Sequence, residues 1–152
     1  MADNIQFTKN FSLQELLLTS NRKFDGEQYN PPAEIIENLR ALCVHILQPL
    51  RDALGTPVNI NSGYRCPSLN TSIGGAKSSQ HMSGQAADII DLNHGNEFLF
   101  LKIKELNLPF DQMIDEFDFR WVHVSYDPAR HRGEILQAKK DANGKTIYVN
   151  PA

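Results

Sequence analysis

Cysteine is scarce in this sequence, and long apolar runs are absent. The two cysteines, Cys43 and Cys66, are too few for a disulfide framework, and neither has the CxxC neighbour typical of a structural zinc site. We therefore expect two reduced thiols. No stretch approaches the roughly 20 apolar residues that a membrane-spanning helix needs, so we expect no membrane insertion.

A strong excess of one charge is also missing. Fifteen Lys and Arg against eighteen Asp and Glu give a formal net charge of −3, which provides no general attraction to nucleic acid. Hydrophobic residues at 41% and charged residues at 22% are typical of a globular domain rather than a disordered chain.

Repeats, linkers and low-complexity segments are absent as well. We therefore predict a single domain over residues 1–152, with a core at about 11–126 and a C-terminal hairpin at about 134–150. The first residues, MADNIQFTKNF, lack the basic start and apolar stretch of a secretory signal. We therefore expect a protein that is made in the cytoplasm without a signal peptide. We also expect it to be a monomer.

Helical patterns dominate the first third of the chain. Residues 12–15 form a capping box, which predicts a short helix to about Thr19 followed by a polar loop. A broad apolar face predicts a long helix from about 31 to 54, with a kink at Pro49 because proline lacks the N–H of the helical hydrogen bond.

Strand patterns dominate the remainder. One helix is predicted at 96–106, and strands are predicted at 58–62, 86–90, 112–117, 121–126, 134–139 and 146–149. Residues 141–144, Asp-Ala-Asn-Gly, are a strong hairpin signal between the last two strands. Helices first and strands last indicate an α+β domain in which N-terminal helices pack on a mostly antiparallel sheet.

A polar, glycine-rich passage at 63–84 is predicted as a loop, and a loop of that length in a small domain usually has a function. His81 lies near its end, and Asp88 lies in the strand that follows. An imidazole and a carboxylate are suitable zinc ligands, but two ligands do not make a site.

The third candidate ligand is His123, in the segment Trp-Val-His-Val-Ser at 121–125. Strand alternation places His123 on the opposite face from its two valine neighbours. If those valines face the core, His123 faces a cleft. Three protein ligands with a fourth position left for water are typical of catalytic zinc, although two histidines and a carboxylate also suit iron or cobalt.

The segments SGYRCPSLN, SSQHMSGQAAD and WVHVS resemble three signatures of the zinc D-alanyl-D-alanine carboxypeptidase and L-alanyl-D-glutamate endopeptidase family. Its members cleave the stem peptides of peptidoglycan, many are phage or prophage lysis enzymes, and the Hedgehog signalling domain shares their core fold. The resemblance covers about 11–126. It implies that His81, Asp88 and His123 bind one Zn²⁺ per chain.

The same resemblance implies roles in substrate binding. Arg65 is a candidate clamp for a substrate carboxylate, since a guanidinium can donate two parallel hydrogen bonds to it. Ser79 is a possible second donor to the same end of the substrate.

A peptidase also needs a general base. The family supplies this base just before the last zinc histidine, but one familiar spacing, three residues before it, falls here on Arg120. Among the nearby acids, strand parity from Gln112 separates Glu116 from Asp115. We favour Glu116 as the base, with Asp118 as the alternative.

Two functions are compatible with these motifs. The first is zinc-dependent hydrolysis of a peptide bond in peptidoglycan stem peptides, by a D,D-carboxypeptidase or an L-alanyl-D-glutamate endopeptidase, as in an endolysin that acts on the cell wall after release or export. The alternative is a catalytically inert zinc-containing binding module of the same fold, for which Arg120 at the expected base position is the distinguishing feature.

Overall fold

A six-stranded mixed sheet forms the centre of the computed structural model, which describes residues 3–151. Its strand order is β1-β2-β4-β3-β5-β6. The strands are β1 (Asn59–Ser62), β2 (Ala86–Ile90), β3 (Gln112–Glu116), β4 (Trp121–Ser125), β5 (Glu134–Lys140) and β6 (Thr146–Val149). Only β3 and β5 pair in parallel. The predicted α+β class and the mostly antiparallel sheet are therefore confirmed.

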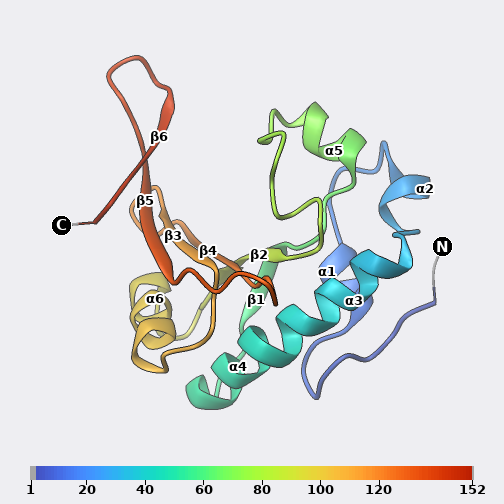
Figure 1. The fold of residues 1–152 in the computed structure, drawn as a ribbon, viewed down its shortest axis with the longest axis horizontal. Coiled ribbons are helices and arrows are strands. Elements are labelled where there is room, and N and C mark those ends of the chain that lie inside the picture. Colours follow the sequence, from blue (N-terminus) through green and yellow to red (C-terminus); the bar gives the residue numbers. More distant parts are fainter. Residues whose placement is uncertain (1–2, 152) are drawn as a thin grey trace.

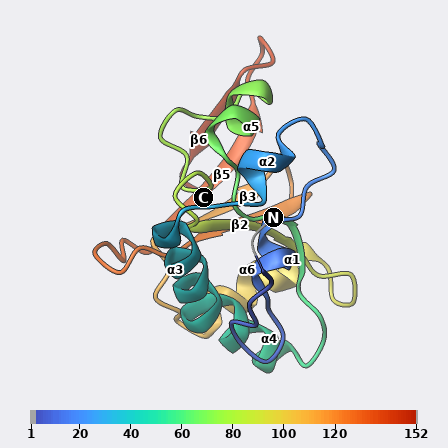
Figure 2. The same ribbon diagram turned by 90° about the vertical axis from the view of Figure 1, so that its right-hand side faces the viewer.

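Helices cover one face of this sheet (Figures 1 and 2). These are α1 (Leu13–Leu17), α3 (Ala33–Leu42), α4 (Gln48–Leu54) and α6 (Asn96–Glu105). Val122 and Val124 of β4 are fully buried and belong to the core, as do Ile89 of β2 and Met113 of β3. Because side chains alternate along a strand, the residues between these point to the other face.

Two short helices occur where loops were expected. They are α2 (Asp25–Gln28) and α5 (Pro67–Ser72). Helices of four and six residues are not stable alone, because nucleation is costly and few hydrogen bonds compensate for it. Their apolar patterns are also too short to be recognised in the sequence. Pro67 at the first turn of α5 was the available signal, since proline is favoured there.

The expected kink at Pro49 takes another form. The chain is helical from Ala33 to Leu54, but Cys43–Leu47 form a π-helical turn that ends two residues before the proline. There the Gln48 N–H donates to the carbonyl of Cys43, five residues back. Within the described range, no helix is long and apolar enough to cross a membrane, and Cys43 and Cys66 are free buried thiols.

A buried carboxylate in the residue before β3 connects several segments. Asp111 is fully buried and accepts hydrogen bonds from Arg132 Nε at 2.8 Å and Gln80 Nε2 at 3.0 Å. Arg130 lies 3.4 Å away. Burial raises the pKa of Asp111, but the hydrogen bonds from Arg132 outweigh this effect and lower it to about 2. Asp111 thereby ties the segment after β4 to the segment that carries His81.

Replacing Asp111 with Asn should destabilise the protein by about 2 kcal/mol at pH 7, because the arginines lose their buried partner. A carboxyl whose pKa is lower when folded stabilises the native state at neutral pH, and this stabilisation is lost as pH falls toward the folded pKa. The difference in unfolding free energy between wild type and variant should therefore fall to about half by pH 3. Urea unfolding at several pH values measures it.

Asp25→Asn is the matched control, because Asp25 forms an exposed ion pair with Arg22. That change should cost less than about 0.5 kcal/mol. Equal and pH-independent losses in both variants would contradict the role given to Asp111.

Candidate metal centre and its cleft

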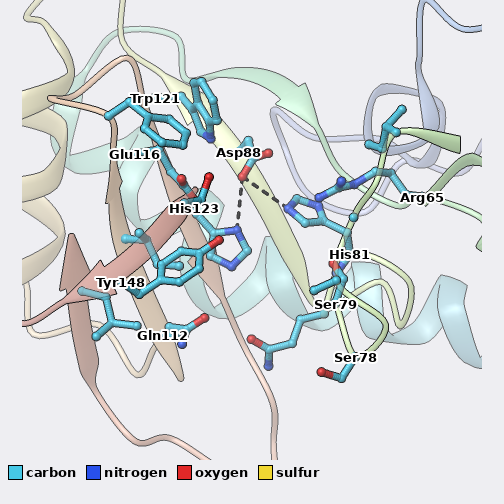
Figure 3. Close-up of a pocket in the computed structure, with 18 of the residues that line it drawn as sticks. Arg65, Ser78, Ser79, His81, Asp88, Gln112, Glu116, Trp121, His123 and Tyr148 are labelled. Atoms are coloured by element: carbon cyan, nitrogen blue, oxygen red, sulfur yellow. Dashed lines mark hydrogen bonds and ion pairs between the residues drawn. The ribbon is translucent and has the colours of Figure 1, made fainter. Parts of the chain in front are cut away.

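Three metal-ligating side chains meet on the sheet face that the helices leave open. His81 precedes β2, Asp88 lies in β2 and His123 lies in β4. One potential ligand atom from each lies within 4.8 Å of the others. Asp88 Oδ1 is 3.3 Å from His81 Nε2 and 3.2 Å from His123 Nδ1, as Figure 3 shows.

The pairing of β2 with β4 explains half of this geometry. Asp88 is the direct cross-strand partner of His123, so their side chains project from the same face of the sheet. Val122 and Val124 point into the core, which turns His123 toward the cleft, as strand alternation predicts.

His81 is oriented by a backbone carbonyl. Its Nδ1 donates a hydrogen bond of 2.7 Å to the carbonyl oxygen of Gly63, which places the ring proton on Nδ1. The lone pair of Nε2 then faces the carboxylate of Asp88. Nε2 is buried and has no hydrogen-bond partner among residues 3–151.

A lone pair facing a carboxylate is repulsive unless a proton or a metal cation lies between them. Two imidazole nitrogens and one carboxylate oxygen are also a common donor set of catalytic zinc. The orienting bond from the far nitrogen of His81 is the kind of support that metal-ligating histidines have. The residues present therefore fit a zinc ion.

Gly63 makes its contact to His81 possible because it has no side chain. A Cβ at this position would collide with the carbonyl oxygen of Leu16. The next residue, Tyr64, donates its N–H to that same oxygen at 2.8 Å, so the segment runs directly against the end of α1.

Gln28, a buried residue of α2, holds the same segment from the other side. Its amide nitrogen donates to the carbonyls of Leu17 and Tyr64 at 2.7 and 2.8 Å, and its oxygen accepts from the Cys66 N–H at 2.9 Å. These contacts bracket Arg65. Gln28 is not among the predicted site residues, because a glutamine in a polar stretch carries no signal of burial.

Arg65, between the two residues that Gln28 holds, extends its side chain to the lining of the cleft that contains the three ligands. Burial lowers the pKa of its guanidinium, while the nearby carboxylates of Asp88 and Glu116 raise it. Its Nε is buried and has no hydrogen-bond partner within the described range. A charged, partly unpaired guanidinium at this position is ready to bind an anionic group.

A cleft of about 1030 Å³ contains the three ligands. Its walls are the segment 73–81 on one side and the β5–β6 hairpin on the other, with β2, β3 and β4 as the floor. The structure brings six of the seven predicted site residues to its lining, namely Arg65, Ser79, His81, Asp88, Glu116 and His123. The hydroxyl oxygen of Ser79 accepts a hydrogen bond from the N–H of His81 at 3.2 Å.

Glu116 and Asp118 lie in different surroundings. Glu116 is 8% exposed and lines the cleft, whereas Asp118 is exposed and is not part of the lining. Burial is the main cause that raises the pKa of Glu116 to about 7, with the Asp88 and Asp115 carboxylates adding to it and His123 and Arg65 opposing it.

The turn after Glu116 has an unusual backbone. Phe117, Asp118 and Phe119 all have positive φ angles, from 56° to 60°, and the Arg120 N–H donates to the Glu116 carbonyl at 3.0 Å. This is one turn of left-handed helix, which costs roughly 1–2 kcal/mol per non-glycine residue.

Side chains on both sides of the turn hold it in place. Asp115 accepts from the Phe119 N–H at 2.7 Å, and the Asn96 amide donates to the carbonyls of Phe119 and Arg120 at 2.9 and 3.0 Å. Strained backbone of this kind clusters at functional sites. Here it ends β3 abruptly, with the side chain of Glu116 still facing the cleft.

Comparison with known proteins gives two matches. A model of the family described as Peptidase M15 matches residues 9–125. A segment of 44 residues is 46% identical to the zinc D-Ala-D-Ala carboxypeptidase of Streptomyces albus G. That alignment covers 28% of this chain and 17% of the relative, so this chain accounts for only a small part of that protein's length.

Gly63→Ala should weaken zinc binding by about 10- to 100-fold, because the displaced carbonyl no longer orients His81. Calorimetric titration of the metal-free protein with zinc measures the affinity. The thermal stabilisation that saturating zinc confers should fall with it.

Gly26→Ala is the matched control. A Cβ at Gly26 meets nothing within 4 Å and its φ is not positive, so zinc affinity should remain at the wild-type value. Unchanged zinc affinity in a folded Gly63→Ala protein would contradict the orienting role of this carbonyl.

Proposed function

The chain belongs to the peptidase M15 family, and on that basis we propose that it is a zinc-dependent peptidase that hydrolyses a peptide bond in the stem peptides of peptidoglycan. The observation that carries this proposal is the convergence of His81, Asp88 and His123 in a cleft that also presents a buried carboxyl and a guanidinium. Zinc at these ligands supplies a Lewis acid and lowers the pKa of water.

Glu116 is the proposed general base. As a carboxylate it accepts a proton from the water that attacks the scissile carbonyl, and it then gives that proton to the departing amine. Burial raises the pKa of Glu116 above the ordinary carboxyl value and so brings it closer to neutral pH, which suits a group that must act first as base and then as acid.

Arg65 and Ser79 are proposed to hold a carboxylate of the substrate. Arg65 can donate a pair of hydrogen bonds to both oxygens, and the Ser79 hydroxyl still has its proton to donate while its oxygen accepts from His81. Binding of a carboxylate there suits both a C-terminal D-alanine and the acidic D-glutamate of the stem peptide, so the cleavage product must distinguish a carboxypeptidase from an endopeptidase.

We propose that the chain acts as a monomer with one zinc ion and meets its substrate at the bacterial cell wall after release or export, as an endolysin does. The cleft placement of Glu116 favours this enzymatic role over an inert zinc-containing binding module. Arg120 occupies one familiar position of the base in the sequence, but here another residue of the same segment presents its carboxyl to the cleft.

Zinc-loaded protein should release peptides with new termini from purified peptidoglycan. Mass spectrometry of the products identifies the bond, and both chelation and His123→Ala should abolish the products. Intact stem peptides after incubation with folded, zinc-loaded protein would contradict the peptidase and support the binding module.

Glu116→Gln should lower kcat/KM by about 10²- to 10⁴-fold, the usual contribution of a general base, while zinc content stays at the wild-type level. Because only the carboxylate can accept the proton, wild-type activity should fall at acidic pH as Glu116 becomes protonated. Burial raises the pKa of Glu116 to about 7 in the metal-free protein, and the charge of a bound zinc ion lowers it, so the acidic limb of the pH profile should lie below pH 7.

Asp118→Asn is the matched control, since it removes a carboxylate two residues away that does not line the cleft. Its kcat/KM should remain within about twofold of wild type, as expected for an exposed position. Loss of turnover in Asp118→Asn with full activity in Glu116→Gln would reverse the assignment of the base.

A further inference from the structure

The β5–β6 hairpin lies outside the region matched by the family, which ends at residue 125. It nevertheless supplies Leu136, Lys140, Thr146 and Tyr148 to the cleft lining. In Figure 1 the hairpin rises from the sheet on the side opposite α5, and the lining of the cleft includes residues of both the hairpin and the segment 73–81 after α5. Family membership therefore assigns no role to this wall.

Strand register places Tyr148 in line with the proposed base. Glu116 pairs with Ala138 across β3 and β5, and Ala138 pairs with Tyr148 across β5 and β6. Direct partners share a face, so all three side chains point to the metal side. Two strand spacings separate the backbones of Glu116 and Tyr148 by roughly 10 Å.

The small side chain of Ala138 leaves the space between these two residues open. The long side chains of Glu116 and Tyr148 can therefore lean toward each other across its methyl group. Figure 3 shows the Tyr148 ring directed into the cleft beside His123, on the same side of the centre as Glu116.

The hydroxyl of Tyr148 is free to bind a ligand. Tyr148 is 55% exposed, and no hydrogen bond within residues 3–151 engages its hydroxyl. Burial and the charges of Glu116 and Asp88 raise the pKa of Tyr148, so the group stays protonated and can donate a hydrogen bond.

The other polar residues of the hairpin wall, Lys140 and Thr146, bond to each other. Lys140 Nζ donates to the Thr146 hydroxyl at 2.7 Å and lies 5.2 Å from the centre of the Phe117 ring. Tyr148 is the polar residue of this wall that lies in register with Glu116.

We propose that the Tyr148 hydroxyl donates a hydrogen bond to the oxygen of the scissile carbonyl as negative charge develops on it. This rests on the proposed peptidase function and adds a catalytic residue from outside the matched region. A donor that binds the charged oxygen more strongly than the neutral carbonyl raises kcat more than it lowers KM.

Tyr148→Phe tests the proposal because it keeps the ring and removes only the hydroxyl. We expect kcat on a stem peptide to fall by about 10²-fold, as for removal of a single oxyanion donor, with KM and zinc content changed by less than about twofold. A phosphinate analogue of the cleaved peptide, which imitates the charged tetrahedral geometry, should bind more weakly by a similar factor in calorimetry.

Tyr126→Phe is the matched control, since Tyr126 is buried just after β4 and does not line the cleft. It should retain wild-type kcat and analogue binding. The pH dependence of kcat tests a second role for Tyr148. If its hydroxyl donated to the Glu116 carboxylate instead, Tyr148→Phe would raise the pKa of Glu116. The acidic limb of the pH profile would then move to higher pH, and the maximal rate would stay unchanged.

If the wild-type protein is active and Tyr148→Phe is equally active, the inference about Tyr148 is wrong and the proposed function stands. The same holds if Tyr148→Phe shifts the acidic limb of the pH profile but leaves the maximal rate unchanged. A wild-type protein that cleaves no stem peptide would overturn the proposed function and this inference with it.

Discussion

The pairing of β2 with β4 is the constraint on which the site depends. It sets Asp88 directly opposite His123, and because Val122 and Val124 must be buried, it also decides which face carries the ligands. A register slip of one residue would bury both ligands in the core and expose the valines. The hydrophobic core under the sheet and the polar chemistry above it are thus two consequences of one alignment.

The third ligand, His81, depends on buried polar contacts. His81 lies in a loop, and a loop by itself does not hold an imidazole to within the tolerance that a metal requires. Gly63 supplies the carbonyl that orients the ring. Gln28 holds the residue after Gly63, and Asp111 holds Gln80, the residue before His81. Each of these groups is fully bonded, so the cost of burying it is compensated.

The two carboxyl groups of the cleft, Asp88 and Glu116, have pKa values shifted in opposite directions by their surroundings. Burial raises the pKa of Asp88, but the neighbouring imidazoles outweigh burial and hold that pKa well below its usual range, as suits a permanent ligand. Glu116 has less compensation, and burial raises its pKa to about 7. Environments that push apart the pKa values of two nearby carboxyls are typical of enzymes that use one as a proton carrier.

Sequence alone was sufficient wherever a pattern is local. The period-two alternation of β2 and β4, the helical pattern of α6 and the turn before β6 all lie within a few residues of their predicted bounds, because each pattern expresses how that segment buries its apolar side chains. The same alternation predicted the face of His123 and the separation of Glu116 from Asp115. The resemblance of three short segments added the ligand set.

Only the tertiary structure decided the rest, because the interactions join residues far apart in the chain. Gln28 bonds to residues 36 and 38 positions away, and neither its burial nor the helix α2 can be read from a polar stretch. The left-handed turn that separates Glu116 from Asp118 is held by Asn96, from another helix. Tyr148 reaches the site because β5 pairs in parallel with β3, a topology that no local pattern encodes.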